Sequence, residues 1–211
     1  MRASNAIVRN HMAHIDLAPI HSHHHAVQFY GDDAELVGTV GLFLSEGLVA
    51  GQPAVVIATE PHREAIISAL ESRFIDVNQA RRLGDLVLLD AEETLAAFMM
   101  KGAPIGPLFK KAVGDLIEQT LRGRARTPVR AYGEMVDVLW KQGKKDAAIR
   151  VEVLWNELAG THAFSLLCGY SIGSFYKQTR QFENICKLHT HVHDHAQKIV
   201  PFEPKQAAKT A

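Results

Sequence analysis

Residues 21–33 read HSHHHAVQFYGDD, and the second half of this stretch decides the fold. The run from Ala26 to Tyr30 is short and β-prone, and the Gly31-Asp32-Asp33 that follows combines a turn residue with helix-capping side chains. The pattern predicts a strand that leads straight into a helix. Many α/β proteins hold a phosphate group at such a helix N-terminus, so phosphate-binding motifs are the first to test.

Short apolar runs alternate with segments of helical periodicity along the rest of the chain. The further runs that predict strands are residues 54–58, 86–89, 129–132 and 164–168. Helices are predicted between them, for example over residues 145–159, by apolar side chains at helical spacing and by capping patterns or first-turn prolines. We therefore expect an α/β fold of three layers: a mainly parallel sheet of about five or more strands with helices on both faces.

The composition indicates one domain with short tails. Of the 211 residues 47% are hydrophobic, enough for one substantial core, and we expect that domain over residues 25–198 with flexible tails at 1–24 and 199–211. Lys and Arg together number 23, as do Asp and Glu, so the basic surplus that non-specific nucleic-acid binding requires is missing. Because there are only two cysteines, no signal peptide and no apolar run that would span a bilayer, we expect a cytoplasmic protein without direct nucleic-acid or membrane contacts.

The phosphate-binding motifs do not match. A P-loop requires GxxxxGK[ST], whereas Tyr30 is followed by GDDAELVG, which lacks a lysine and carries carboxylates that would repel a phosphate. The Gly143-Lys144 pair is followed by Lys145 and has Val138 in place of the first glycine, and no GxGxxG occurs. ATP or dinucleotide binding through either motif is therefore not expected.

One catalytic motif does match. Residues 169–173 read GYSIG, a GxSxG sequence directly after a predicted strand, as in the nucleophile elbow of α/β-hydrolases. Those enzymes take their acid and histidine from later strands, but the residues after this motif look helical and offer only Glu183 and His189 for the two roles. A hydrolase that uses Ser171, or a diverged NTPase, is thus the enzyme alternative to a binding function.

Ligands of parallel α/β sheets bind at the carboxyl ends of the strands, so the residues after each predicted strand are candidates. In this chain they are polar or aromatic, and we expect a small-molecule site lined by Tyr30, Thr59, Asp90, Glu134 and Tyr170. Helix capping is the alternative role for Thr59 and Asp90, and Glu134 in a first helical turn would complement the helix dipole.

Arg130 stands inside an otherwise apolar strand, so its guanidinium needs a partner if it is buried. The acidic residues near strand ends that offer themselves are Glu134, Asp90 and Glu157. If one of them forms a buried ion pair, Arg130→Met leaves its carboxylate unpaired and costs on the order of 3 kcal/mol.

Residues 182–195 hold the densest set of potential metal ligands. On a helix, His189 and His193 lie four residues apart and could clamp a borderline cation, with Cys186 one turn earlier. A surface helix whose histidines bind no metal is the alternative. The metal candidates are Cys186, His189, His191 and His193, and no other cofactor is expected.

The same segment carries apolar residues at helical spacing. They are Phe175, Phe182, Ile185, Leu188 and Val192. A long amphipathic helix after the last recognised strand predicts either a homodimer through this helix or packing against the chain's own sheet, and the pattern does not separate the two.

Several separate blocks of the sequence together resemble a known family. The blocks are HxxQFY at 25–30, EGLxxGQPAVVIATxxHR at 46–63, LVLLDAEETL at 86–95, VRAYGEMV at 129–136, LWNEL at 154–158 and FSLLCxY at 164–170. In this order they resemble the MEDS domain, the methanogen and methylotroph sensory domain that also occurs in the dichloromethane-responsive regulator. The resemblance extends over about residues 25–195.

The resemblance implies a non-catalytic sensory module with a RecA/KaiC-like core that has lost its P-loop. Such a module is proposed to recognise small hydrocarbon derivatives and to act on a signalling protein such as a histidine kinase or an anti-sigma-type regulator. The family's characteristic polar and aromatic positions fall on His25, Tyr30, His62, Arg63, Asp90, Arg130, Glu134, Trp155, Glu157, Cys168 and Tyr170. The region around Cys186, His189 and His191 also resembles the family's C-terminal Ile-Cys-x-x-His stretch. His193 and His195 depart from the continuation that the family implies, and Ser171 is not a family position.

Overall fold

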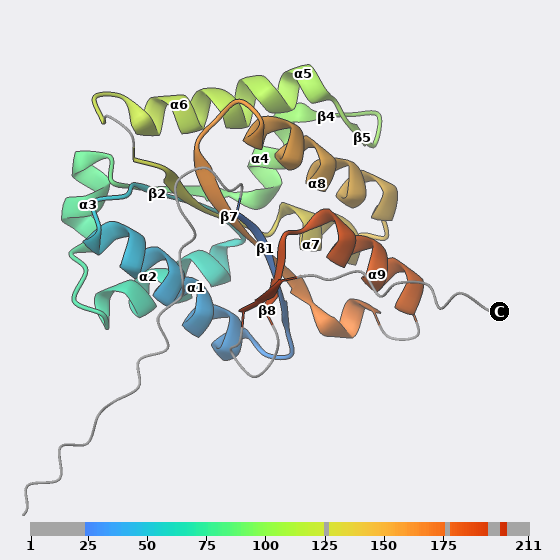
Figure 1. Ribbon diagram of the computed structural model, residues 1–211, viewed down its shortest axis with the longest axis horizontal. Coiled ribbons are helices and arrows are strands. Elements are labelled where there is room, and N and C mark those ends of the chain that lie inside the picture. The colour runs from blue at the N-terminus through green and yellow to red at the C-terminus, as the bar shows by residue number, and fades with distance from the viewer. Residues whose placement is uncertain (1–23, 125–126, 176–177, 194–198, 202–211) are drawn as a thin grey trace, which may run out of the picture.

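The structure is a computed structural model that describes residues 24–124, 127–175, 178–193 and 199–201. Its centre is a seven-stranded sheet in the order β3-β2-β6-β7-β1-β8-β9, with helices on both faces (Figure 1). The strands are β1 (His24–Tyr30), β2 (Ala54–Ala58), β3 (Leu86–Asp90), β6 (Val129–Gly133), β7 (Phe164–Ser171), β8 (His191–His193) and β9 (Ile199–Pro201). All adjacent pairs are parallel except β8 with β9. The predicted three-layer, mainly parallel α/β fold is confirmed.

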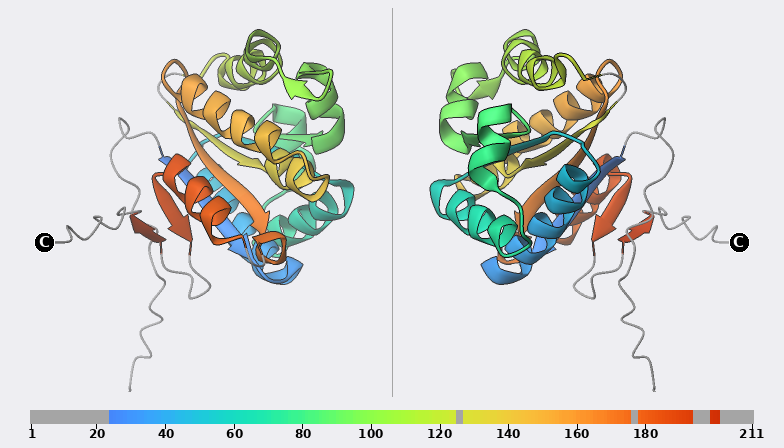
Figure 2. Two further views of the ribbon diagram at one scale, coloured as in Figure 1. Left: turned by 90° about the vertical axis from the view of Figure 1, so that its right-hand side faces the viewer. Right: turned by 90° about the vertical axis from the view of Figure 1, so that its left-hand side faces the viewer.

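Two layers of helices enclose the sheet (Figures 1 and 2). One layer consists of α1 (Asp33–Val49), α2 (Glu60–Glu71) and α3 (Val77–Leu83). The other contains α4 (Ala91–Phe98), α5 (Gly106–Phe109), the π-helix η1 (Lys110–Gly114), α6 (Asp115–Leu121), α7 (Met135–Lys141), α8 (Lys145–Ala159), the 3-10 turn η2 (Ile172–Phe175) and α9 (Thr179–Leu188). A two-stranded hairpin, β4 (Met99–Met100) with β5 (Ala103–Pro104), separates α4 from α5.

The alternation of side chains along the strands divides the apolar interior into two cores. In β7, Leu166 and Cys168 face the core under α4–α9, whereas Leu167 faces the core under α1–α3. In β6, Ala131 and Tyr132 separate in the same way. This two-sided burial explains why the central strands read as nearly continuous apolar runs.

Local capping starts several of the helices where the sequence predicts. The carboxylates of Asp32, Asp76 and Asp90 accept hydrogen bonds from first-turn backbone amides of α1, α3 and α4. Pro61 and Pro107 occupy first-turn positions of α2 and α5, where the missing N–H has no cost. Within the described residues, no helix has both the length and the apolar character to cross a bilayer.

The predicted long C-terminal helix is confirmed as far as Leu188 and is wrong for residues 189–193, while residues 194 and 195 lie outside the described part of the chain. Helix α9 has ten residues and ends at Leu188, and His189 has extended backbone angles. The Thr190 amide donates to the His25 carbonyl at 2.7 Å, and residues 191–193 pair with β1 as the parallel strand β8. Pairing with the sheet edge thus overrides the helical period. Residues 199–201, which the composition assigns to the tail, form β9.

Candidate functional site

A cleft of about 200 Å³ opens at the carboxyl edge of the sheet, beyond the ends of β2 and β6. It is lined by Thr59, His62, Glu92, Glu134, Asp137, Val138, Lys141 and Gln142. Five of these side chains carry ionisable groups. The location agrees with the general position of ligand sites in parallel sheets.

A histidine–carboxylate pair forms the floor of this cleft. Chain geometry brings the two together: His62 lies in the first turn of α2 directly after β2, and Glu134 is the residue between β6 and α7. His62 Nδ1 is 2.5 Å from Glu134 Oε2, which also accepts from the Tyr132 hydroxyl at 3.0 Å. The Thr59 amide donates to the other Glu134 oxygen. The Glu134 carboxylate is therefore buried but fully hydrogen-bonded.

The pair is polarised towards the charged state of both partners. The hydrogen bond to Glu134 raises the pKa of His62 and outweighs burial, while Asp33 lies 3.3 Å from the other ring nitrogen and adds to the effect. Burial acts to raise the pKa of Glu134, but the bonds from His62 and Thr59 hold it below its ordinary value. An imidazolium with a carboxylate on each side is the resulting arrangement.

A second polar group lies beside this pair and contains a residue that the sequence analysis missed. The Asp137 side chain accepts from the Tyr30 hydroxyl and from the Ser171 amide, both at 3.0 Å, and from Lys141 at 2.8 Å. Asp137 thereby links the ends of β1 and β7 to α7. It stands in an apolar helix, one turn after Glu134. A charged residue at such a buried position is the sequence feature that could have identified Asp137 as part of the site.

Arg63 and Asp90 complete the polar edge. Arg63 Nη1 donates to Asp90 Oδ2 and to the Ala58 carbonyl, both at 2.6 Å. Asp90 also caps α4, so the capping role and the site role coincide in one side chain. Of the residues predicted from sequence, the structure thus brings Tyr30, Thr59, His62, Arg63, Asp90 and Glu134 to this edge.

The other predicted residues lie elsewhere. Trp155 is buried in the core against Phe109 and Phe164. Glu157 is exposed and pairs with Arg150 at the rim of a separate hollow of about 440 Å³. That hollow is larger, but its charged groups lie at its exposed rim, so we place the candidate site at the sheet edge. The side chains of His25, Cys168 and Tyr170 converge on Glu152 inside the molecule.

The predicted partners of Arg130 are wrong. Arg130 is only 1% exposed, and its guanidinium donates to Gln52 Oε1 at 2.6 Å and to the Phe43 carbonyl at 3.2 Å. It also lies over the Phe43 ring, 4.9 Å from the centroid. Arg130 is the second residue of β6, so it lies at the end of the strand opposite the carboxyl edge, where Glu134 and Asp90 are.

The geometry around Ser171 does not resemble a nucleophile elbow. The serine ends β7 opposite Tyr30 in the register with β1, whereas His189 packs on His25 near the start of β1. Five residues of strand separate the two positions, roughly 16 Å. The nominal serine–histidine pair is therefore not assembled.

The C-terminal metal candidates are not brought together either. Cys186 is buried in the core, where burial raises the pKa of its thiol to about 11. His191 stacks on His24 at 4.4 Å. Of the four candidates, His189 alone belongs to a group of three or more potential ligands among the described residues.

These features define a three-layer α/β domain with a polar cleft at the carboxyl edge of its sheet. The family model for the MEthanogen/methylotroph, DcmR Sensory domain, MEDS, matches residues 24–190. The chain belongs to the MEDS family, which gives it a sensory or regulatory role.

Among solved structures, the chain is similar to the uncharacterized protein PH0321 from Pyrococcus horikoshii, described in complex with an unknown peptide. The TM-score is 0.58 at 13% identity, over 81% of this chain and 77% of that chain. Likeness at this identity shows the fold alone. No curated protein matches the sequence.

Proposed function

We propose that this protein is a non-catalytic sensory module that binds a small molecule in the cleft at the carboxyl edge of the sheet. The observation that carries the proposal is the buried His62–Glu134 pair, whose charges and hydrogen bonds are held in place beneath the cleft. Convergent polar groups with perturbed pKa values in a concave site are the usual mark of a binding or active site.

The size and lining of the cleft restrict the ligand. A volume of about 200 Å³ is below the range of pockets for drug-sized molecules, so the ligand has few heavy atoms. The lining offers acceptors on Glu92 and Asp137, a cation on Lys141 and one apolar wall from Val138. A short hydrocarbon derivative with one polar group matches this combination.

A route from the cleft to the surface runs through α7. Asp137 and Lys141 of the cleft flank Trp140, whose ring stacks on Phe175 at 4.8 Å and whose Nε1 donates to the Ser174 carbonyl at 3.4 Å. Phe175 in turn contacts Phe182 of α9, with ring centroids 5.8 Å apart. A ligand that shifts α7 would therefore alter how α9 packs, provided that it binds the two arrangements with different affinity.

The receiver of the signal in this proposal is a separate signalling protein, such as a histidine kinase or an anti-sigma-type regulator. The apolar stripe of α9 packs within the chain's own core, so it supplies no argument for a homodimer. The exposed face of α9 carries Glu183, Asn184 and Lys187, and a partner would meet this polar face.

A binding screen on the full-length protein tests the proposal. The probes are one- to four-carbon alcohols, aldehydes, amines and carboxylates. Ligand-observed NMR measures the binding of each probe. Gln142→Trp narrows the cleft from its rim, and Gln79→Trp places the same side chain at an exposed position of α3 as the control. We expect at least about 10-fold weaker binding in Gln142→Trp alone, equal to about 1.4 kcal/mol. The proposed site would be contradicted if both variants bound a probe as tightly as the wild-type protein does, or if the wild-type protein bound no probe. Turnover of an ester or of ATP would contradict the non-catalytic role.

A further inference from the structure

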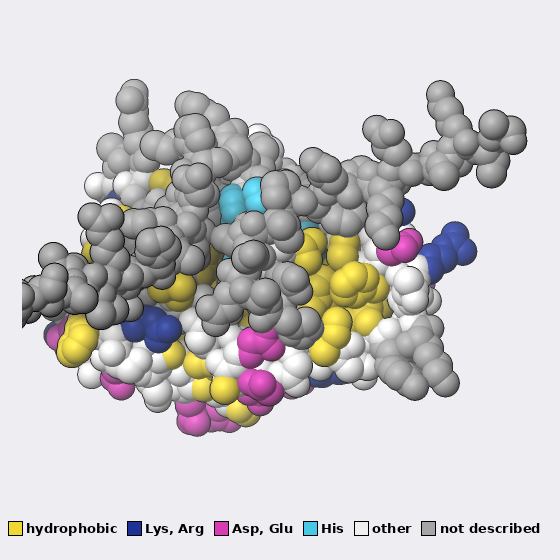
Figure 3. All heavy atoms as spheres, turned by 60° about the horizontal axis from the view of Figure 1, so that its bottom comes forward, with side chains coloured by type: hydrophobic (Ala, Val, Ile, Leu, Met, Phe, Trp, Pro, Cys, Tyr) yellow, Lys and Arg dark blue, Asp and Glu magenta, His cyan; other side chains and the backbone are white. Residues whose placement is uncertain are grey.

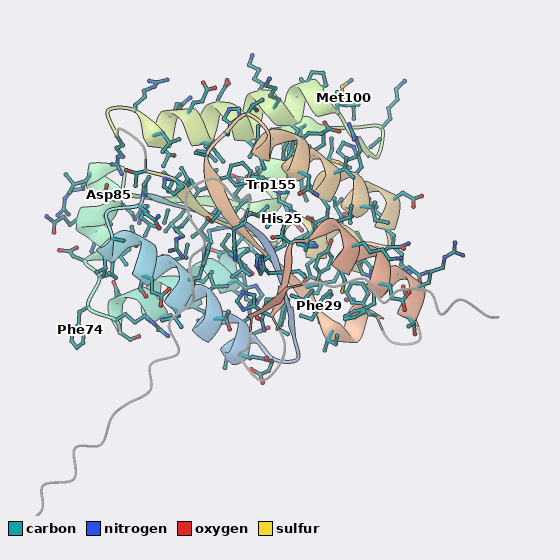
Figure 4. All side chains as sticks on the ribbon, viewed as in Figure 1. His25, Phe29, Phe74, Asp85, Met100 and Trp155 are labelled. Carbon is teal, nitrogen blue, oxygen red and sulfur yellow. The ribbon has the colours of Figure 1, made fainter. Side chains whose placement is uncertain are left out.

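Four potential metal ligands meet in the interior, away from the proposed ligand cleft. They are His25 of β1, Glu152 of α8, Cys168 of β7 and His189, which follows α9. All four are buried, and their ligand atoms lie within 4.8 Å of one another. Figure 4 shows His25 in the middle of the molecule, whereas Phe74 lies at its periphery.

Four of the distances in this cluster are close to the edge lengths of a coordination polyhedron. His25 Nε2 lies 3.2 Å from Glu152 Oε2 and 3.4 Å from Cys168 Sγ. His189 Nε2 lies 3.4 Å from Glu152 Oε1, and Cys168 Sγ lies 3.6 Å from Glu152 Oε2. A tetrahedron with metal–ligand bonds of about 2.0–2.3 Å has edges of about 3.3–3.8 Å, so small side-chain shifts would close the site.

Both imidazoles are oriented from behind, as metal-bound histidines are. His25 Nδ1 is 2.9 Å from Asn156 Oδ1, and the Asn156 amide is fixed because its Nδ2 donates to the Leu188 carbonyl. His189 Nδ1 is 2.8 Å from the Ile185 carbonyl. Each Nδ1 therefore carries the proton, and each Nε2 lone pair faces Glu152.

This arrangement places two lone pairs against a buried carboxylate. His189 Nε2 is among the few buried side-chain atoms of the described residues without a hydrogen-bond partner, although it is within ion-pair distance of Glu152. The nitrogen has no proton to donate when Nδ1 holds it, so its approach to Glu152 is not a hydrogen bond. A cation is needed between these groups, either a proton on an imidazole or a metal ion.

We propose that His25, Glu152, Cys168 and His189 bind one Zn²⁺-class divalent metal ion. Imidazole, thiolate and carboxylate are the ligand types that zinc accepts, in tetrahedral sites. Binding transfers the Cys168 thiol proton to solvent, and the ion then balances one thiolate and one carboxylate. The buried site becomes neutral, as the interior requires. The Tyr170 hydroxyl, 2.9 Å from Glu152 Oε1, supports the carboxylate from the side.

The ion would connect the C-terminal segment to the sheet. Three ligands come from β1, β7 and α8, and the fourth comes from the residue that joins α9 to β8. Metal occupancy would therefore fix the position of α9 and β8. The site is spatially separate from the cleft, which lies at the other end of β1.

Cobalt substitution on the full-length, untagged protein tests whether the cation at this cluster is a metal ion or a proton on an imidazole. The protein is treated with a chelator, dialysed and titrated with Co²⁺ and, in competition with a chromophoric chelator, with Zn²⁺. We expect one equivalent of metal and a cobalt–thiolate charge-transfer band. The band should vanish in Cys168→Ser and persist in Cys186→Ser, and Glu152→Gln should weaken Zn²⁺ binding at least about 10-fold.

Histidines outside the cluster require their own control. Figure 3 shows a small group of histidine side chains exposed on one face of the molecule. His191 of β8 is half-buried. In His191→Asn we expect unchanged stoichiometry and an unchanged band. Absence of the band in the wild-type protein, or equal loss in the Cys186→Ser and His191→Asn controls, would overturn the proposal and leave a shared proton as the cation. The wild-type spectrum decides even if a cluster variant fails to fold.

Discussion

Glu134→Gln is the most direct test of the buried pair beneath the cleft. The wild-type carboxylate is 3% exposed and accepts from His62, Tyr132 and the Thr59 amide. Glutamine keeps the shape but replaces one acceptor oxygen by a donor, so the imidazolium loses its buried counter-charge. Breaking a buried pair on one side costs about 3–5 kcal/mol, and the isosteric amide, which retains one acceptor, puts the expected loss near 3 kcal/mol.

The control is the same substitution at Glu118, whose carboxylate is 69% exposed and lies 3.2 Å from His162. An exposed pair of this kind contributes about 0–1 kcal/mol. Urea unfolding, monitored by far-ultraviolet circular dichroism, gives the free energy of unfolding of both variants. In thermal unfolding the melting temperature of Glu134→Gln should fall by roughly 6–12 °C. Equal shifts in the two variants would refute the reasoning, because burial and hydrogen bonding would then add nothing to the pair.

Three further outcomes are expected. Asp90→Ala should lose about 1 kcal/mol more than Asp76→Ala in urea unfolding, since both remove a cap but only Asp90 also holds Arg63; equal losses would remove the Arg63 link. Because the His62 pKa is raised above 6.5, its stabilising effect is complete below pH 6.5 and disappears as pH rises through the folded-state pKa; the stability difference between wild type and His62→Gln should shrink accordingly, and a flat difference would contradict it. Arg130→Met should cost about 1–2 kcal/mol, because Gln52 Oε1 and the Phe43 carbonyl lose a donor but no buried carboxylate loses its counter-charge; a loss well above about 3 kcal/mol would restore the ion-pair hypothesis.

Local patterns predicted the elements of the fold well. The five main strands and the capped helices follow from apolar runs, Asp caps and first-turn prolines, all of which act over a few residues. The strand-end rule also located Tyr30, Thr59, His62 and Glu134 because parallel strands bring their carboxyl ends to one edge.

Long-range contacts account for what the sequence did not predict. Strand β8 forms through backbone bonds to β1, more than 160 residues earlier, and no local period encodes them. The buried cluster depends on Glu152, a charged residue next to Val151 in the buried stripe of α8. A charged residue in a buried stripe is a sequence feature that indicates a buried polar site. The partners of Glu152 could not be predicted in this way, because they come from three other elements.

The division of the interior into two cores has a spectroscopic consequence. Both tryptophans, Trp140 and Trp155, belong to the core beneath α4–α9, and the core beneath α1–α3 has none. Intrinsic tryptophan fluorescence therefore reports on one side of the sheet, while circular dichroism reports on the helices of both. Loss of the α1–α3 layer alone would appear as ellipticity that falls before the emission spectrum shifts.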